Sequence, residues 1–502
     1  MDAIDWLAKY ELYSPDKTAI VEIEAGKRFT FQELNKQANR YAQLFTNLGL
    51  KTGDRVAVLF PNGAEILFVL FAATKCGIVF LPLNHKLAAP ELAQIIENAA
   101  PGLMIFDNYF RTLADDVMNL SPGLRSLALD DLRTEASWLL NPGPPAIAPD
   151  LEAIQMLLYT SGTTGQPKGV MLSNRMALWN SVNTSLRMLA PGDTVLVHTP
   201  MFYTGGLNVY TLPNLYLGGT VAIMQSFNAE AVLRCVERER ITGLFGVPTQ
   251  LLMMAETEIF PHVDLSSLRF VFSGGAPCPV PLIERYASRG ITLQQGYGLT
   301  EVGVNCFALE KRHSLRKAGS IGYPNFAMEA RLLDDAGKEV APGEVGELAL
   351  RSPAMSSGYW KNPAETERAY RDGWFMTGDL ASCDQDGCYY IAGRKKDMFI
   401  SGGENVYPAE VETLLRSHPK ILDAAVIGIP HEKWGEVGKA AVVLRPAEDM
   451  SADEVTRWCQ GKIGKYKIPK SIHFLEQLPH NNMGKVDKTE LRRLVLSGAQ
   501  VL

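Results

Sequence analysis

The stretch Tyr159-Thr-Ser-Gly-Thr-Thr-Gly-Gln-Pro-Lys-Gly-Val170 follows an apolar segment, residues 154–158, that is typical of a buried strand. It holds three glycines, four Ser or Thr residues and one lysine in twelve positions. Such a loop can surround phosphate oxygens with N–H and O–H donors, because glycine lets the backbone approach an anion closely. Lys168 follows Gly165 by three and precedes Gly169, so the spacing fits neither G-x-x-x-x-G-K-[ST] nor G-x-G-x-x-G. The loop is therefore predicted to bind phosphate, and a Walker-type NTPase or a Rossmann dehydrogenase is disfavoured.

The residues before this loop alternate between helical and strand patterns. Thr30 is a plausible helix cap, with Glu33 three positions later and apolar residues at helical spacing over 31–48. Residues 55–60 then predict a strand, residues 64–75 a helix and residues 77–82 a second strand. Such alternation predicts a largely parallel sheet covered by helices. The proline-rich segment 139–149 is predicted to be a loop that joins subdomains.

The pattern changes from about residue 337. Pro342-Gly343-Glu344, Asp372-Gly373 and Asp386-Gly387 are turn signals at short intervals between apolar runs. They predict mostly antiparallel strands.

The residues after Arg394 form a unit of their own. A helix is expected over 408–417, followed by strands over 424–428 and 439–444. The sequence thus predicts a large α/β part and a smaller α+β part at the C-terminal end.

Composition narrows the functional classes. The chain has 502 residues, with 49 Lys and Arg against 55 Asp and Glu, which gives a net charge of −6. At about 100–200 residues per domain, the length predicts about two to four compact domains. Proteins dedicated to nucleic acids normally present a basic face, so no nucleic-acid partner is expected.

No membrane span or targeting segment is expected. The most apolar stretch, residues 66–83, is interrupted by Lys75 and Gly77 and falls short of the ~18–20 apolar residues that a span needs. The first residues carry acids where a secretory signal carries positive charge. Seven cysteines without a C-x-x-C pair argue against a disulfide framework or a zinc site. We therefore expect reduced thiols and a cytoplasmic enzyme.

Four further motifs follow the glycine-rich loop in order: Gly296-Tyr-Gly-Leu-Thr-Glu301; Thr377-Gly-Asp-Leu380; Gly393-Arg-Lys-Lys-Asp397 with Ser401-Gly-Gly-Glu-Asn405; and Asn482-Met-Gly-Lys485. Together with the loop they resemble the motifs of the adenylate-forming (AMP-binding) superfamily, of the acyl-CoA synthetase or fatty-acid–CoA ligase type. The resemblance covers the chain from the loop to near its end. Five ordered matches make an accidental likeness improbable.

The resemblance implies a fold and a reaction. The fold would be α/β, with a large multi-sheet N-terminal domain (1–395) that includes a small β-barrel-like part, and a small mobile α+β domain (396–502). The reaction would join a carboxylic acid to ATP, giving acyl-AMP and pyrophosphate, and then transfer the acyl group to coenzyme A. The implied cofactor is Mg²⁺, and ATP and coenzyme A would be co-substrates. A homodimer is left open.

The resemblance also assigns roles to residues that would be ordinary turn, cap or surface residues if taken alone. Lys485 would bridge the carboxylate and the α-phosphate, Glu301 would bind Mg²⁺, and Thr160 would complete the catalytic set. The residues implied in ATP and AMP binding are Thr160, Ser161, Gly162, Thr163, Thr164, Gly165, Lys168, Gly274, Gly275, Ala276, Gly296, Tyr297, Gly298, Thr300, Asp379 and Arg394. Among these, Tyr297 would stack on adenine, and Asp379, assisted by Arg394, would hold the ribose.

The C-terminal part is implied in movement and in thiol binding. Lys396 matches the hinge about which the small domain would rotate between the two half-reactions. The residues implied in coenzyme A binding are Ser401, Gly402, Gly403, Trp434, Tyr466 and Lys470. For Trp434, Tyr466 and Lys470, ordinary packing and solvated lysines are an equally good interpretation.

The acid is expected to bind at His198-Thr-Pro-Met-Phe-Tyr-Thr-Gly-Gly-Leu-Asn208, where Phe202, Tyr203, Gly206 and Asn208 would form the acyl pocket, with a wall near residues 302–307. Amino-acid-activating relatives usually carry Asp where this chain has Tyr203, so an α-amino acid is disfavoured. Many acyl-CoA relatives carry His there. No Arg or Lys occurs over residues 198–219, which disfavours a dicarboxylate. A fatty acid is the first expectation and an aryl acid the second.

Three other functions remain open at the level of sequence. An acyl-AMP ligase would pass the acyl group to a carrier protein supplied in trans. A non-enzymatic nucleotide-binding relative is disfavoured because Lys485, Glu301 and Asp379 are all present. A luciferase-type oxygenase uses the same motifs and is disfavoured only by its rarity.

Overall fold

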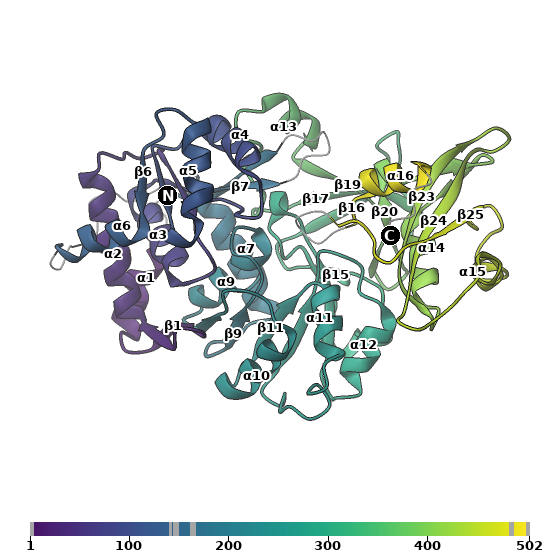
Figure 1. Cartoon of the computed structure of the whole chain (residues 1–502), viewed down its shortest axis with the longest axis horizontal. Coiled ribbons are helices and arrows are strands. Elements are labelled where there is room, and N and C mark those ends of the chain that lie inside the picture. The colour runs from purple at the N-terminus through teal and green to yellow at the C-terminus, as the bar shows by residue number, and fades with distance from the viewer. Residues whose placement is uncertain (1–4, 140–142, 144–149, 161–166, 481–485, 498–502) are drawn as a thin grey trace.

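The computed structural model describes residues 5–139, 143, 150–160, 167–480 and 486–497 (Figure 1). Over these residues the strands form four sheets. Two large sheets and their helices occupy one end of the molecule, and the C-terminal elements occupy the other.

The first large sheet has six strands and is parallel except for its last pair. In spatial order its strands are β6 (Ser126–Ala128), β5 (Leu103–Phe106), β3 (Arg55–Leu59), β4 (Val79–Pro82), β7 (Ile154–Thr160) and β8 (Lys168–Ser173). The helices that follow these strands are α3 (Ala64–Cys76), α4 (Ala89–Ala99), α5 (Arg111–Leu120, after the short η1 of Asn108–Phe110) and α6 (Leu129–Ser137). The glycine-rich loop connects β7 to β8, and residues 161–166 of it lie outside the described residues.

The second large sheet has nine strands. In spatial order they are β15 (Tyr323–Pro324), β14 (Phe307–Ala308), β13 (Leu293–Tyr297), β12 (Phe270–Ser273), β11 (Gly243–Gly246), β9 (Thr194–Val197), β10 (Thr220–Ile223), β1 (Thr18–Glu22) and β2 (Lys27–Thr30). Its helices are α1 (Trp6–Tyr13), α2 (Phe31–Asn47), α7 (Asn174–Arg187), α8 (Thr204–Leu207), α9 (Thr211–Tyr216), α10 (Ala229–Glu239), α11 (Pro248–Ala255) and α12 (Val280–Ala287).

Alternating side chains of these strands build the layers. In β3, Val56 and Val58 join the core that α2 and α3 share with both large sheets, whereas Ala57 and Leu59 join a core under α4 and α5. In β12, Val271 packs under α10, α11 and α12 on the other outer face. Because successive side chains of a strand point to opposite faces, both sheets are buried on both sides.

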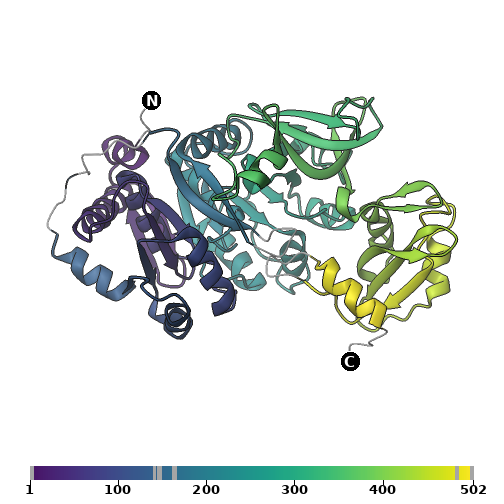
Figure 2. The same cartoon turned by 90° about the horizontal axis from the view of Figure 1, so that it is seen from above.

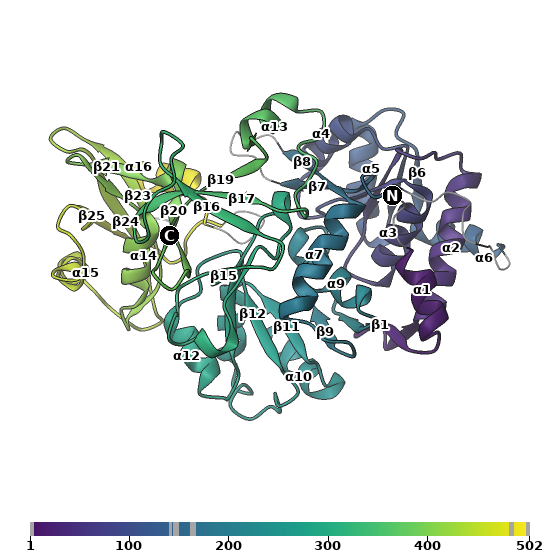
Figure 3. The same cartoon turned by 180° about the vertical axis from the view of Figure 1, so that it is seen from behind.

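The third sheet is antiparallel and consists of β16 (Glu329–Leu333), β17 (Val345–Arg351), β18 (Tyr370–Arg371), β19 (Trp374–Cys383) and β20 (Tyr389–Arg394). The helix α13 (Pro363–Ala369) precedes β18. Seen from behind, α13 lies beside β7 and β8 of the first sheet (Figure 3). Backbone hydrogen bonds fix this contact, since Trp360 N donates to Gly169 O at 2.7 Å. The segment before α13 thereby reaches the glycine-rich loop.

The C-terminal elements form a separate lobe, which Figure 2 shows beside the third sheet. Its strands are β21 (Phe399–Ser401), β22 (Glu404–Val406), β23 (Ile421–His431), β24 (Gly435–Leu444) and β25 (Ser471–Phe474), and its helices are α14 (Pro408–Arg416), α15 (Ala452–Cys459) and α16 (Lys488–Ser497). The lobe has two cores of its own on the two faces of β23 and β24. We call these elements the C-terminal lobe.

The structure confirms the expected α/β class with several sheets and a small α+β unit. The helix expected over 31–48 is α2, and Thr30 and Glu33 form the expected capping box at its start. The strand expected over 77–82 begins two residues later, because Gly77 has a φ of 64° and ends α3. No helix within the described residues is long and apolar enough to cross a membrane.

Candidate active site

A cavity of about 1030 Å³ opens where the parallel strands of both large sheets end. The residues at the carboxyl ends of β7, β11, β12 and β13 all line it, which is the usual place for a ligand in sheets of this kind. The predicted site residues that line it are Thr160, Lys168, Tyr203, Gly206, Gly274, Gly275, Gly296, Tyr297, Gly298, Thr300, Glu301, Arg394 and Lys396. Segments more than 200 residues apart thus meet at one site.

Several predicted residues lie elsewhere. Ala276 is exposed and does not line the cavity. Phe202 is buried edge-on against His85, with ring centroids 5.0 Å apart. Asn208 is buried and its amide donates to Thr204 Oγ1 at 3.2 Å. Ser161, Gly162, Thr163, Thr164, Gly165 and Lys485 lie outside the described residues.

One wall of the cavity carries a cluster of charges beside the glycine-rich loop. Lys168 and Arg368 both form ion pairs with Glu365, the latter at 2.8 Å. The Lys168 ammonium also lies 5.5 Å from the centre of the Tyr359 ring. All four residues line the cavity, so two cations face any anionic group that enters here.

Glu301 lies in the short η2 (Thr300–Val302) and faces the same wall. Its Oε1 accepts a hydrogen bond from the Tyr359 hydroxyl at 3.0 Å. Its backbone carbonyl accepts from Ser356 N at 2.8 Å and from the Tyr370 hydroxyl at 3.4 Å. Burial raises the pKa of Glu301 above its usual range, and the Tyr359 hydrogen bond opposes this effect. The carboxyl group is therefore held in place and needs an opposing positive charge to ionise fully.

The residue Tyr359 gives a testable effect on pH dependence. Because its hydroxyl stabilises the ionised form of Glu301, Tyr359→Phe should raise the pKa of Glu301 further. If activity needs the carboxylate, the acidic limb of kcat/KM for ATP should move to higher pH by about half a unit or more. Steady-state pyrophosphate release as a function of pH measures this shift.

Tyr370→Phe is the matched control for this measurement. The Tyr370 hydroxyl contacts the Glu301 carbonyl and Ser356, not the carboxyl group. The acidic limb should therefore stay in place. If the acidic limb of the pH profile moves equally in both variants, the group that titrates there is not Glu301.

Tyr297, Asp379 and Arg394 form a second polar group in the cavity. The Tyr297 hydroxyl donates to Asp379 Oδ2 at 2.5 Å, and Arg394 Nε pairs with Asp379 Oδ1 at 2.7 Å. Asp379 and Arg394 are paired neighbours on β19 and β20. Asp379 is only 4% exposed and does not itself line the cavity, although Gly378 and Arg394 do. The carboxylate thus fixes the Tyr297 ring and the guanidinium at the cavity wall.

Glycine is required on both sides of Tyr297. A Cβ at Gly298 would lie 1.7 Å from the Val304 carbonyl oxygen, and one at Gly296 would lie 2.0 Å from the Phe272 ring. Neither position has room for a side chain. The backbone on either side of Tyr297 therefore packs closely against its neighbours.

Tyr203, Gly206, Val209, Phe245 and Val304 line a less polar part of the same cavity. The Tyr203 hydroxyl accepts a hydrogen bond from Asn84 Nδ2 at 2.8 Å, which ties the expected acid-binding segment to the loop after β4. Burial raises the pKa of Tyr203 to about 12, so the hydroxyl stays neutral at physiological pH. This position is thus a neutral aromatic wall.

The residues expected to bind coenzyme A lie on the C-terminal lobe, outside the cavity. Gly402 and Trp434 lie against each other, since Gly402 N donates to Trp434 O at 2.9 Å and a Cβ at Gly402 would lie 2.9 Å from the indole. Trp434 and Tyr466 are partly exposed, at 42% and 38%. In the part of the lobe that the structure describes, neither Tyr466 nor Lys470 forms a hydrogen bond or ring contact with Trp434.

Four further residues line the cavity that no sequence motif predicted: Tyr359, Glu365, Arg368 and Phe245. Glu365 and Lys168 are 197 positions apart, so no local pattern could pair them. The Asn362-Pro363 pair could have indicated the start of α13, where the Asn362 side chain caps the helix. That signal predicts a helix and not a contact with the glycine-rich loop.

The carboxyl group of Glu301 is also a candidate ligand for a metal ion. Among the described residues, no group of three or more His, Cys, Asp or Glu side chains could hold a metal by itself. Mg²⁺ usually takes one or two carboxylates together with substrate phosphates and water. Glu301, beside the cations that face an incoming anion, fits that donor set.

Comparison with known proteins agrees with this geometry. Residues 10–360 match the family described as AMP-binding enzyme, and residues 410–485 match the AMP-binding enzyme C-terminal domain. The chain is 40% identical to a feruloyl-CoA synthase of Amycolatopsis sp, covering 97% of this chain and 98% of that protein. It is 35% identical to the long-chain-fatty-acid–CoA ligase FadD13 of Mycobacterium tuberculosis, covering 98% of each.

Among solved structures, an o-succinylbenzoate coenzyme A synthetase of Bacillus subtilis in complex with ATP and a magnesium ion is similar over 98% of this chain and all of that one, with a TM-score of 0.88 and 30% identity. The chain therefore belongs to the AMP-binding, adenylate-forming enzyme superfamily and is an AMP-forming acid–CoA ligase of that family.

Proposed function

We propose that the chain joins an aryl-substituted carboxylic acid to coenzyme A, at the expense of ATP. The observation that carries the choice of acid is the wall formed by Phe245. A Cβ at either Gly205 or Gly274 would lie 3.4 Å from the Phe245 ring, so the ring is flanked by bare backbone on both sides. With Tyr203 also lining the cavity, this gives flat aromatic surfaces on which a planar acid can stack. The feruloyl-CoA synthase at 40% identity supports the same class.

The reaction has two chemical steps. In the first, a carboxylate oxygen of the acid attacks the α-phosphorus of ATP, the bond from that phosphorus to the β-phosphate oxygen breaks, and pyrophosphate leaves. In the second, the coenzyme A thiol loses its proton, its sulfur attacks the acyl carbon, and AMP leaves. Mg²⁺, when bound, neutralises phosphate charge that would otherwise repel the carboxylate.

The polar residues of the cavity suit the first step. Lys168 and Thr300 would contact the phosphates, and Glu301 would hold Mg²⁺. Tyr297 would stack on the adenine, and the Asp379–Arg394 pair would hold the ribose. Lys168 exchanges its ion pair with Glu365 for a phosphate in this scheme, which keeps the ammonium paired in both states.

The two half-reactions use different positions of the C-terminal lobe. We place the boundary between residues 395 and 396, within η4 (Lys395–Asp397), and take Lys396 as the hinge. His480 and Lys396 line the cavity, so the C-terminal lobe contributes to the adenylation site in this position. Rotation would then bring Ser401, Gly402, Gly403 and Trp434 toward the acyl group.

A fatty acid is the second candidate. Val209, Val304 and Phe272 make the same part of the cavity apolar, and FadD13 at 35% identity acts on long-chain fatty acids by its name. We also place the enzyme in a reducing compartment such as the cytoplasm, since all seven cysteines are free and six of them are buried.

The deciding experiment measures pyrophosphate release and thioester formation with ATP, Mg²⁺ and coenzyme A. The panel contains ferulate, cinnamate, benzoate and indoleacetate against fatty acids from butyrate to palmitate. Aryl thioesters formed at a kcat/KM at least about tenfold above that of every fatty acid would support the proposal. A rise toward one fatty-acid length would support the second candidate, and release without thioester would favour transfer to a carrier protein.

A single substitution tests which wall binds the acid. Val304 is half-buried and lines the cavity, so Val304→Phe should fill acid-binding space. We expect kcat/KM for the preferred acid to fall by about tenfold or more, with ATP affinity measured by calorimetry unchanged. Val280→Phe, at an exposed position outside the cavity, is the control and should retain full activity. Equal activity of both variants would contradict this location of the acid.

A further inference from the structure

The chain entering the C-terminal lobe is anchored to the third sheet up to Lys395. Arg394 Nε pairs with Asp379 Oδ1 at 2.7 Å. The next side chain, Lys395, pairs with Glu347 Oε2 at 3.0 Å and with Asp335 Oδ1 at 2.9 Å. Glu347 lies in β17 and Asp335 in the loop before it, so both partners belong to the third sheet. Two consecutive residues are thus held by that sheet.

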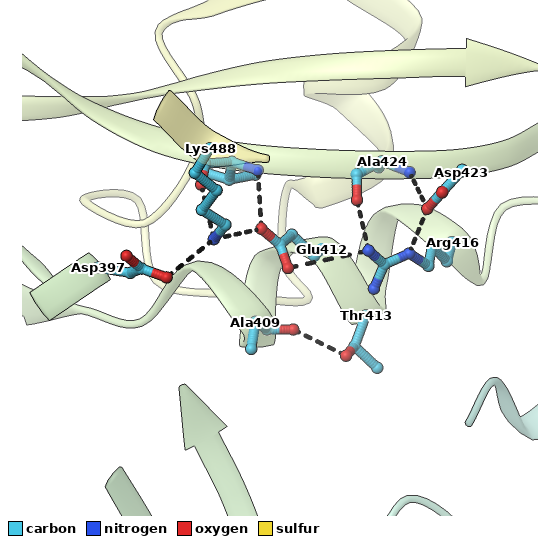
Figure 4. A network of polar contacts seen from close by, with 9 residues as sticks. Asp397, Ala409, Glu412, Thr413, Arg416, Asp423, Ala424 and Lys488 are labelled. Atoms are coloured by element: carbon cyan, nitrogen blue, oxygen red, sulfur yellow. Dashed lines mark hydrogen bonds and ion pairs between the residues drawn. The ribbon is translucent and has the colours of Figure 1, made fainter. Parts of the chain in front are cut away.

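The chain after the hinge is anchored to the C-terminal lobe instead. Asp397 Oδ2 lies 3.9 Å from the ammonium of Lys488, the first residue of α16. The same ammonium pairs with Glu412 Oε1 of α14 at 2.9 Å and donates to the Val426 carbonyl of β23 at 3.2 Å (Figure 4). Glu412 is only 8% exposed and also accepts from Val426 N at 2.9 Å. Lys488 therefore joins Asp397 to two elements of the lobe core.

Lys396 stands between these two sets of anchors. Its side chain lines the cavity and makes no hydrogen bond or ion pair with any residue that the structure describes. The residue before it is held by the third sheet and the residue after it by the lobe. A backbone hydrogen bond from Met398 N to Arg394 O at 3.1 Å crosses this point, and rotation about the backbone of Lys396 would have to break it.

We propose that the ion pairs of Lys395 and of Lys488 confine the rotation of the lobe to the backbone of Lys396, which makes Lys395 and Lys488 positioning residues for both half-reactions. The proposal rests on the two-step function above. The physical basis is that, if the backbone could rotate at several residues of the linker, the lobe would sample many orientations, and few of them would be productive. A misplacement of about 1 Å at a catalytic group can cost about 100-fold in rate.

The variant Lys395→Met tests this directly. Lys395 is 44% exposed on its side chain, so its replacement leaves the cores intact, while Glu347 and Asp335 lose their shared cation. We expect acid-dependent pyrophosphate release and transfer from supplied acyl-AMP to coenzyme A both to fall by about tenfold. Lys395→Arg should recover both rates to within about threefold, because it restores the cation.

Lys338→Met is the matched control. Lys338 is exposed in the same loop between β16 and β17, and its ammonium has no ion pair among the described residues. It removes the same charge from the same sheet without touching the hinge. Both half-reactions should stay at the wild-type rate.

A second readout distinguishes hinge control from a simple loss of activity. Fluorophores at Glu258→Cys and Asp449→Cys, both exposed, report the distance between the large part and the lobe. Cys383, the one cysteine that is not buried, is first replaced by Ser. The distance distribution should broaden in Lys395→Met and be normal in Lys395→Arg and Lys338→Met. Lys488→Arg should likewise keep it narrow, whereas Lys488→Met leaves the buried Glu412 with Arg416, at 3.9 Å, as its remaining ion-pair partner and is examined only if it folds.

The outcomes separate this proposal from the function on which it rests. If the wild type catalyses neither half-reaction with any acid, the proposed function is wrong. The distance distributions then still test whether Lys395 restricts the rotation of the lobe. If the wild type catalyses both and Lys395→Met matches it in both rates and in the width of the distribution, the proposal is overturned.

Discussion

Glu301→Gln should lower the rate of acid-dependent pyrophosphate release by at least about 100-fold. The amide has the shape of the carboxyl group and can still accept the hydrogen bond from Tyr359 at 3.0 Å. The backbone of Glu301, which is held by Ser356 and Tyr370, is not altered. What the substitution removes is the negative oxygen that fits Mg²⁺. The loss should therefore appear as a weaker response to Mg²⁺ and not as misfolding.

The measurement is pyrophosphate release across a range of Mg²⁺ concentrations at fixed ATP, together with calorimetric binding of ATP with and without Mg²⁺. In the wild type, Mg²⁺ should tighten ATP binding, and in Glu301→Gln it should do so much less. Glu310→Gln is the control, because Glu310 pairs with Arg187 and Arg312 and does not line the cavity. A Glu301→Gln enzyme with a normal Mg²⁺ response would show that another group holds the metal.

Local rules predicted the elements of this fold well. Thr30 and Glu33 predict the start of α2, because a capping box satisfies two backbone donors within four residues. The structure contains that capping box. Turn residues such as Asp386-Gly387 predicted the antiparallel third sheet, where Gly387 has a φ of 80°. Such signals depend on neighbours in sequence, so they can be found without the fold.

The order of the strands could not be predicted in this way. Apolar alternation shows which face of a strand is buried, but it does not show which strand lies beside it. The pairing of β1 with β10 joins residues about 200 positions apart, such as Ile20 and Val221. The two large sheets pack through α2 and α3. The apolar face of α2 and the almost fully buried α3 show that these helices are covered, but no periodic pattern specifies which sheet covers them.

The candidate site shows the same division. Tyr297, Thr300 and Glu301 belong to one motif, so the sequence placed them together and the cavity contains all three. The hydrogen bond from Tyr359 to Glu301 and the ion pair from Lys168 to Glu365 depend on the segment before α13 lying along β8. That contact is tertiary, so these residues became visible only in the structure.

Lys485→Ala should separate the two half-reactions more sharply than any other substitution. We expect acid-dependent pyrophosphate release to fall by about 1000-fold. The Lys485 charge would stabilise the phosphorus centre mainly in the transition state, so its removal raises the activation barrier. Transfer from supplied acyl-AMP to coenzyme A should stay within about threefold, since the phosphoryl chemistry is already complete. Lys485 itself lies outside the described residues. On either side of it, His480 and Val486 form an isolated antiparallel bridge, and His480 lines the cavity.

Arg492→Ala provides the matched control, because Arg492 is an exposed cation on α16, seven positions beyond Lys485. It removes the same charge from the same end of the lobe, and both half-reactions should be unaffected. Loss of both half-reactions in Lys485→Ala would indicate damage to the lobe and not the loss of a transition-state contact. Pyrophosphate release near the wild-type rate would show that another cation performs the step. Lys168, released from Glu365, would then be the first residue to test, since it belongs to the glycine-rich loop and lines the cavity.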